Sequence, residues 1–180
     1  SITGKDREKN SFDFETNFIH HLSSPNPYRK KESQSEEEFC DEKVKEFEDK
    51  ILEIGPNKVA AFIAEPILAS GGCIVHPKNY LKRFWEICKK YDVLYIADEV
   101  VTGFGRLGHF FSSEKEFGII PDIITTAKGI TSGYIPLGAV LISDALIKNI
   151  SKESSLFFHG YTYSGHPTSC AAALKNIEII

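Results

Sequence analysis

The sequence of 180 residues has no methionine, a single tryptophan and no long apolar run. A membrane-spanning helix needs about 20 consecutive apolar residues, and none is present, so we expect no membrane association. The first residues, SITGKDREKN, also lack the apolar stretch of a signal peptide.

Cysteine is scarce as well. The four cysteines, Cys40, Cys73, Cys88 and Cys170, show no CxxC spacing of the kind that zinc or redox sites use. We expect free thiols in a reducing compartment, and therefore a cytoplasmic protein. A His20-His21 pair has no carboxylate or cysteine at ligand spacing, which favours a solvated loop and no metal site.

Basic residues are not in excess. Residues 1–58 hold 10 Lys/Arg against 14 Asp/Glu, and residues 59–180 hold 11 of each. A nucleic-acid partner requires a basic face, so none is expected. The hydrophobic fraction of 42% and the charged fraction of 26% are typical of a globular domain. The chain begins at Ser1 and stops inside an apolar helical pattern, so we expect part of a larger protein.

The order of elements predicts an α/β fold with a mostly parallel sheet and helices on both faces. We expect an irregular surface segment over 1–34, a helix over 35–54 and an α/β core over 59–180. Ser35 and Glu38 form a capping box before the first helix, and Gly55 ends it. Short apolar runs predict strands at 59–66, 93–97, 122–127 and 137–143, and helices are expected at 77–91 and from 169 onward.

Three of these strands end at an ionisable residue: Glu65, Asp98 and Lys128. Ligands of open α/β sheets bind outside the carboxyl ends of the strands, so these side chains are expected at one crevice. Each taken alone is more often a structural salt bridge or a solvated strand end than a functional group.

Two kinds of enzyme fit the central strand. A P-loop nucleotide hydrolase uses a strand that ends in Asp-Glu, but it requires a GxxxxGK[ST] loop, which these residues do not contain. A pyridoxal phosphate (PLP) enzyme requires a lysine amine and a carboxylate against the pyridine nitrogen. Lys128 and Asp98 match these two requirements, and Val100 is placed to lie against the ring.

The longer motifs carry a family resemblance. The segments IADEVVTGFGRLGHFF, TTAKGITSGYIPLGAVLIS and FFHGYTYSGHPTSCAAAL resemble the class III aminotransferases of PLP fold type I, above all the branch that acts on ω-amino acids and amines with pyruvate. The resemblance is clear from AEPILASGG onward and looser before it. It implies a transaminase that uses an amine or amino-acid donor and a keto-acid acceptor.

The resemblance also implies roles for single residues. Lys128 would be the Schiff-base lysine and proton shuttle, Asp98 would pair with the pyridine nitrogen, and Val100 would pack on the ring. Thr162 would reach the cofactor phosphate of the partner subunit in a homodimer with a shared active site, and Glu65 would lie near the site. The family's small C-terminal domain is expected to be absent from these 180 residues, so the activity of the chain alone stays open. An aminomutase or decarboxylase of the same fold, and an inactive truncated copy that only dimerises, remain as alternatives.

Overall fold

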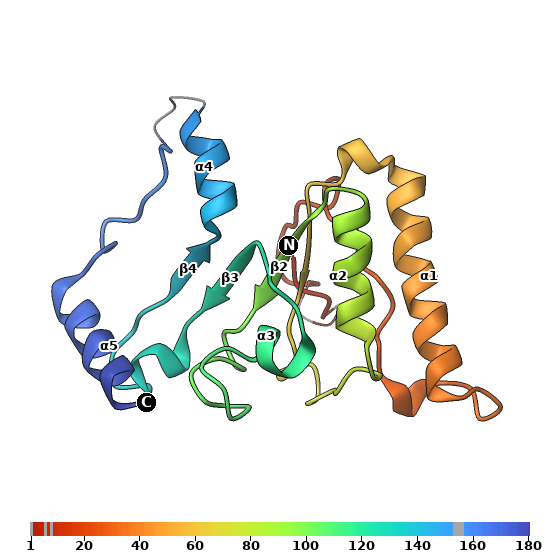
Figure 1. Cartoon of the computed structure of the whole chain (residues 1–180), viewed down its shortest axis with the longest axis horizontal. Helices are drawn as coiled ribbons and strands as arrows, with labels where there is room; N and C mark the ends of the chain where they lie inside the picture. The colour runs from red at the N-terminus through yellow and green to blue at the C-terminus, as the bar shows by residue number, and fades with distance from the viewer. Residues whose placement is uncertain (1, 6, 8, 153–156) are drawn as a thin grey trace.

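The computed structural model of the chain describes residues 2–5, 7, 9–152 and 157–180. It has an α/β architecture built around one four-stranded sheet (Figure 1). In the view of Figure 1, helices α1 (Glu36–Ile54) and α2 (Tyr80–Lys90) lie at one end of the sheet, and helices α4 (Asp144–Lys152) and α5 (Pro167–Ile179) lie at the other end.

The sheet follows the order of the chain. Its strands are β1 (Ala61–Ala64), β2 (Leu94–Asp98), β3 (Ile123–Thr126) and β4 (Ala139–Ile142), in the order β1-β2-β3-β4. The first three strands are parallel, and β4 runs antiparallel to β3. Parallel neighbours require a crossover connection, and α2 (Tyr80–Lys90) provides the one between β1 and β2. The predicted mostly parallel α/β sheet is confirmed.

The helix predicted over 35–54 is present as α1 (Glu36–Ile54) with its capping box. The Ser35 side chain accepts a hydrogen bond from the Glu38 N–H, and the Glu38 carboxylate accepts one from the Ser35 N–H. Gly55 follows the helix at φ +98°, a backbone conformation that glycine adopts without strain. Local sequence therefore sets both ends of this helix.

The hydrophobic core lies between α1, α2 and the sheet. Phe84 of α2 is completely buried, and its ring stacks on that of Phe47 of α1, with centroids 4.6 Å apart. The rings of Phe62 on β1 and Tyr80 on α2 complete the cluster, with centroids 5.2 Å and 4.1 Å from that of Phe84. This aromatic cluster packs α1 and α2 against β1.

Several boundaries differ from those that the sequence predicts. The helix expected from residue 77 begins at Tyr80, because Asn79 has left-handed backbone geometry and the Tyr80 N–H bonds the carbonyl of Pro77 in a turn. The strand expected from residue 59 begins at Ala61, because the Val59 N–H is used by a short 3-10 turn (Pro56–Lys58). Helix α5 (Pro167–Ile179) begins two residues earlier than expected.

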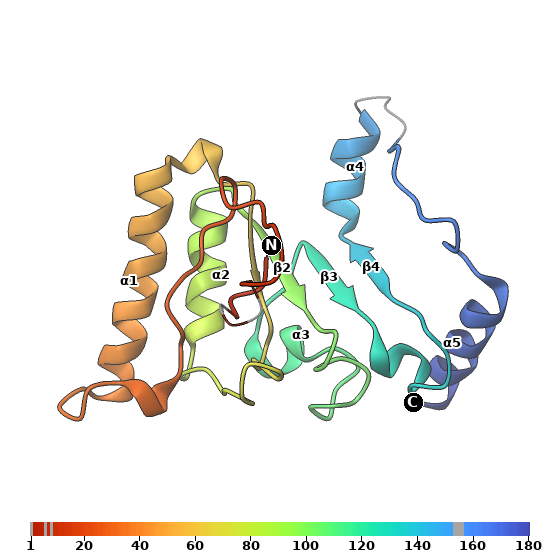
Figure 2. The ribbon, with the colours of Figure 1, turned by 180° about the vertical axis from the view of Figure 1, so that it is seen from behind.

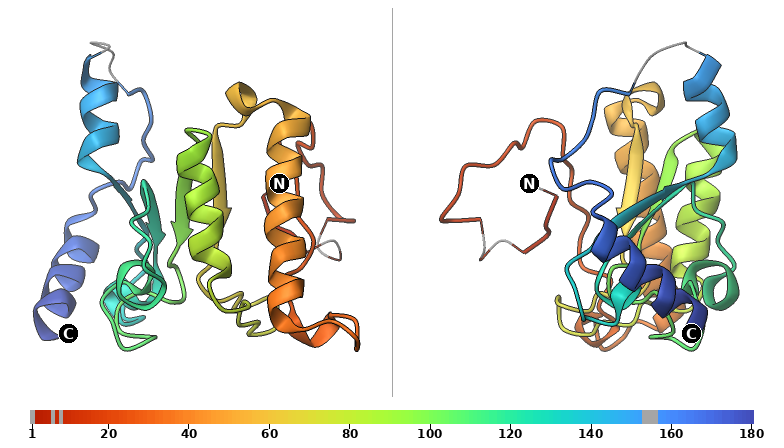
Figure 3. Two further views of the ribbon diagram at one scale, coloured as in Figure 1. Left: turned by 45° about the vertical axis from the view of Figure 1, so that its right-hand side comes forward. Right: turned by 90° about the vertical axis from the view of Figure 1, so that its left-hand side faces the viewer.

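Two helices were not predicted: α3 (Ser112–Phe117) and α4 (Asp144–Lys152). The six residues of α3 are too few to show a helical period in the sequence. Residues 1–34 are irregular where they are described, apart from a 3-10 turn (Pro27–Arg29). Seen from behind and from the side, this segment lies on the opposite side of the sheet from α2 (Figures 2 and 3).

Large apolar side chains are exposed toward the C-terminal end of the chain. Val140 on β4 is 61% exposed, Phe158 is 92% exposed and Tyr163 is 80% exposed. A folded domain rarely leaves so many large apolar groups in water unless another surface covers them.

In the part of the chain that is described, no helix is both long and apolar enough to cross a bilayer. The same residues contain no group of three or more His, Cys, Asp or Glu side chains that could hold a metal ion. His21 instead lies with Nε2 3.0 Å from the backbone oxygen of Ile2. All four cysteines are free, and Cys40 and Cys88 are buried.

Candidate active site

Asp98 is the last residue of β2 and is half-buried. Its Oδ1 accepts a hydrogen bond from the backbone N–H of Val100 at 3.1 Å, which closes a short turn at the end of the strand. Val100 is also half-buried and follows directly in this turn. The carboxylate is therefore held in place at the edge of the sheet while remaining partly accessible.

Lys128 lies at the corresponding end of β3, the strand next to β2. Asp98 pairs with Thr125 of β3, and Lys128 lies three residues beyond Thr125 along the chain. Its φ is +45°, a left-handed conformation that side-chain-bearing residues seldom adopt and that often marks a functional position. The side chain is exposed. The amine is thus available for chemistry.

Helix α5 holds the turn that begins at Lys128. The Asn176 side chain donates from Nδ2 to the carbonyl oxygens of Gly129, at 2.9 Å, and Ile130, at 3.2 Å. Its Oδ1 accepts from the Ser132 hydroxyl at 2.5 Å. The Asn176 side chain on α5 therefore makes hydrogen bonds to Gly129 and Ile130 in the 3-10 turn (Lys128–Thr131) and to Ser132, which follows the turn.

Glu65 follows β1, the strand on the other side of β2 from β3, and is half-buried. The pKa of the Glu65 carboxyl is raised, mainly because the group is partly buried. A hydrogen bond from the Ala69 N–H at 3.1 Å lowers the pKa, and the negative charge of Asp98 raises it. The positive charges of Lys5 and Lys128 lower the same pKa. The three strand ends gather at one edge of the sheet, because Ala64 pairs with Ala97 and Asp98 pairs with Thr125. The roles expected of Glu65, Asp98 and Lys128 at this edge stay predictions.

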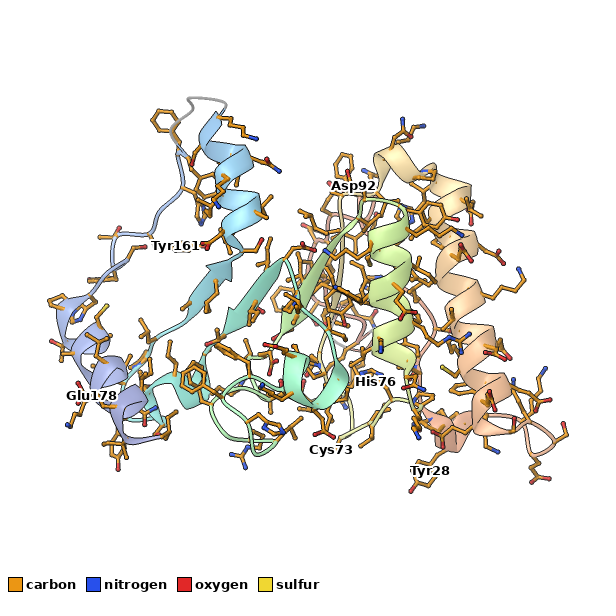
Figure 4. The ribbon with its side chains drawn as sticks, viewed as in Figure 1. Tyr28, Cys73, His76, Asp92, Tyr161 and Glu178 are labelled. Atoms are coloured by element: carbon orange, nitrogen blue, oxygen red, sulfur yellow. The ribbon has the colours of Figure 1, made fainter. Side chains whose placement is uncertain are left out.

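Two buried polar atoms at these strand ends lack a hydrogen-bond partner among the described residues: Nδ1 of His76 and Oγ1 of Thr126. The His76 Nε2 is 2.9 Å from the Glu65 carbonyl oxygen, which can only accept, so Nε2 carries the proton. Burial lowers the pKa of His76 and keeps the ring neutral, and the ring stacks on Tyr80. Figure 4 shows His76 near the end of α2, on the same side as Cys73. Unpaired buried polar atoms are rare in folded proteins and suit a region that receives a polar ligand.

Thr162 is not part of this gathering. It is exposed and begins a turn over residues 162–165 on the segment between α4 and α5. In Figure 4 its neighbour Tyr161 lies on this outer segment, well away from His76 and Cys73. The prediction that Thr162 serves a partner subunit's site stays a prediction, and its position leaves it free to act outside its own chain.

Comparison with known proteins bears on this arrangement. The model of the family "Aminotransferase class-III" matches residues 1–180, the whole chain. The chain belongs to the class III aminotransferases. This assignment agrees with the resemblance read from the motifs around Asp98 and Lys128, and it favours that reading over a nucleotide hydrolase.

Curated relatives of this class III aminotransferase chain are transaminases. A gamma aminobutyrate transaminase 3, chloroplastic, from Solanum lycopersicum is 44% identical over 99% of the chain, and a putrescine–pyruvate aminotransferase from Pseudomonas aeruginosa is 46% identical over 93%. The matched regions cover 35% and 36% of these two relatives, so the chain spans about a third of their length.

Solved structures agree in fold. An omega transaminase from Pseudomonas jessenii in complex with PMP is 42% identical, with a TM-score of 0.94 over 100% of this chain and 40% of that one. An (S)-enantioselective omega-transaminase from Thermomicrobium roseum is 43% identical, with a TM-score of 0.93 over 98% of this chain and 39% of that one. The class III aminotransferase fold of the chain rests on both sequence and structure.

Sequence reasoning missed two residues that support the site. Glu99 belongs to the Asp-Glu pair that follows β2, but its sequence position indicated no role, because its partners Ser112 and Ser113 on α3 lie 13 and 14 residues away. Asn176 gave no signal, because its partners Gly129 and Ile130 are 47 and 46 residues away in the sequence. Both contacts depend on tertiary packing that a local pattern does not contain.

Proposed function

We propose that the protein carrying this chain is a PLP-dependent aminotransferase that moves an amino group from an amine or ω-amino acid to a keto acid such as pyruvate. The observation that supports the proposal is the position of Asp98 and Lys128 at the same ends of the adjacent parallel strands β2 and β3, with Glu65 at the same end of β1. The names of the relatives, among them putrescine–pyruvate aminotransferase, support the choice of donor and acceptor.

The residues present fit the cofactor. A site for PLP requires one amine for a covalent bond and one carboxylate for the ring nitrogen, and both side chains are partly accessible at one edge of the sheet. The unpaired Thr126 hydroxyl, two residues before Lys128, adds a polar atom without a described partner at the same place. When bound, PLP supplies a ring that accepts the electrons left as the substrate Cα–H bond breaks.

The chain's own residues have separate tasks in this proposal. Lys128 would hold the cofactor covalently through Nζ and, once released, would carry a proton away from the substrate Cα as a general base. Asp98 would keep the ring nitrogen protonated, because an anion beside it favours the charged form. Val100 would pack against the ring, and Glu65 would lie beside the reacting groups.

The remaining parts of the proposal concern assembly and location. The chain would be part of the large cofactor-binding domain of a homodimer, in which Thr162 reaches the cofactor phosphate of the partner subunit. The exposed apolar side chains near Val140 and Phe158 support a covering surface. A cytoplasmic location is supported by the four free cysteines, which suit a reducing compartment.

The test uses the gene product that carries these 180 residues, purified and incubated with PLP. The wild type is expected to gain a visible absorbance band and to convert pyruvate to alanine when an amine donor is present. Lys128→Ala should lose both, while Lys148→Ala, an exposed lysine on α4, should keep both. An Lys128→Ala variant with the band and the activity intact would contradict the proposal. Turnover that does not need pyruvate would point to an aminomutase or a decarboxylase instead.

A further inference from the structure

Glu99 follows Asp98 directly, and its side chain is completely buried. Its Oε2 accepts hydrogen bonds from Thr102 Oγ1 at 2.8 Å, from Ser112 Oγ at 2.7 Å and from the Ser112 backbone N–H at 3.2 Å. Its Oε1 accepts from the Ser113 N–H at 2.8 Å and from Ser113 Oγ at 2.5 Å. Two of these donors are backbone N–H groups, which can only donate, so both carboxylate oxygens act as acceptors.

The backbone of Glu99 is fixed as well. Its N–H donates to the carbonyl oxygen of Thr125 on β3 at 2.9 Å, and its own carbonyl accepts from the Gly103 N–H at 3.0 Å. A Cβ added at Gly103 would lie 2.9 Å from the Glu99 carbonyl oxygen, so the chain passes very close at this point. The turn that follows β2 is therefore tied to the neighbouring strand, to its own far end and to α3.

This turn determines where Asp98 points. The Asp98 carboxylate is held by the N–H of Val100, and Val100 lies between Glu99 and Thr102, the two residues joined by the buried hydrogen bond. Successive residues at a strand end point to opposite sides, so Glu99 faces the interior while the half-buried Asp98 faces the other side of the sheet. Any movement of the Glu99 anchor moves the Val100 N–H and the Asp98 carboxylate with it.

We propose that Glu99 is a positioning residue, a buried anchor that holds Asp98 in line with the ring nitrogen of the cofactor. This inference rests on the proposed function above. The same contacts also stabilise the start of α3, because they satisfy the N–H groups of Ser112 and Ser113, so the test must separate positioning from stability. A site that must hold one carboxylate to within a fraction of an ångström does need a rigid support.

The test is a double-mutant cycle in the PLP-loaded gene product, with Glu99→Gln, Asp98→Asn and the double variant. Glutamine keeps the size of the side chain but offers an NH₂ group to donors that need an acceptor. A misplacement of about 1 Å can cost roughly 100-fold in rate, so Glu99→Gln is expected to lower kcat by about 10- to 100-fold. In the Asp98→Asn background the same change is expected to cost less than about 2-fold, because the carboxylate that Glu99 positions is already gone. Glu114→Gln, an exposed glutamate on α3, is the matched control and should leave kcat unchanged.

A second readout separates positioning from general destabilisation. The pH midpoint of the visible band of the bound cofactor, measured well below the unfolding temperature, is expected to shift in Glu99→Gln in the same direction as in Asp98→Asn. If Glu99→Gln does not fold, Thr102→Val removes one donor to the carboxylate and should show a smaller shift, and Thr102→Ser should restore the wild-type midpoint.

Equal rate losses from Glu99→Gln in both backgrounds, or an unchanged midpoint, would overturn the inference while leaving the transaminase proposal standing. If the wild-type protein gains no visible band and moves no amino group to pyruvate, the proposed function fails and the inference fails with it.

Discussion

The Asn176 Nδ2 donates a hydrogen bond to the carbonyl oxygen of Gly129 at 2.9 Å, and so connects helix α5 to the residue beside Lys128. A second hydrogen bond to Ile130 makes the amide a clamp on the turn. The lysine has left-handed backbone geometry, which costs free energy and persists only where the surrounding structure holds it. The hydrogen bonds of Asn176 therefore help to hold the strained backbone at Lys128 in place.

Asn176→Ala removes this clamp. Losing hydrogen bonds that leave carbonyl oxygens half-buried should cost about 1–3 kcal/mol of unfolding free energy, and the looser turn should weaken retention of the cofactor. Thermal unfolding and equilibrium dialysis against PLP would measure the two effects. Lys175→Ala, the exposed neighbour on the same helix, should change neither by much. An Asn176→Ala protein as stable as that control would show that the clamp contributes nothing.

Gly103 offers a test of close packing beside the site. A Cβ there would lie 2.9 Å from the Glu99 carbonyl oxygen, a backbone atom that cannot move without moving the turn after β2. Gly103→Ala is therefore expected to destabilise the fold by about 1–3 kcal/mol and to lower activity. Gly160→Ala is the matched control, because nothing lies within 4 Å of its added Cβ and its φ is not in the left-handed range. Equal melting temperatures for the two variants would contradict the close approach.

The raised pKa of the Glu65 carboxyl predicts that the stability of the fold depends on pH. Burial raises the pKa of its carboxyl above the usual 4.5, so the folded protein holds the proton up to a higher pH than the unfolded chain does. The group then favours folding below pH 4.5 and loses that contribution as the pH rises through the folded pKa. Glu65→Gln should accordingly unfold at a higher temperature than the wild type at pH 8, with the difference vanishing near pH 4.

The exposed Glu53 gives the opposite sign. The Lys50 side chain that bonds it lowers the pKa of its carboxyl, so its contribution is present above pH 4.5 and is lost as the pH falls. Glu53→Gln should slightly lower the unfolding temperature at pH 8. A Glu65→Gln variant that behaves like Glu53→Gln would show that the Glu65 carboxyl is not penalised by burial.

The sequence predicts the elements whose causes are local. The helix at 35–54 follows from its capping box and from the Gly55 stop, and the positions of β2 and β3 follow from short apolar runs closed by Asp98 and Lys128. The gathering of these strand ends also follows, because parallel neighbours end at one edge of a sheet. What the sequence does not predict depends on distant partners. Helix α3 is anchored by Glu99 across 13 residues, and the clamp of Asn176 spans 47.

Asp98→Asn tests whether the Asp98 carboxylate keeps the ring nitrogen of the cofactor protonated. It keeps the shape and leaves an oxygen that can accept the Val100 N–H, so the turn should survive and the cofactor should still bind and absorb visible light. It removes the negative charge that would keep the ring nitrogen protonated, and loss of one such electrostatic partner costs about 10²–10³-fold in kcat.

Asp92, in the turn before β2, is the matched control: it is exposed and has φ +55°, which asparagine adopts as readily as aspartate. In Figure 4 it lies at the other end of α2 from His76, away from the candidate site. Single-turnover rates of the two variants should therefore differ by at least a hundredfold, and a near-normal rate for Asp98→Asn would remove this carboxylate from the reaction.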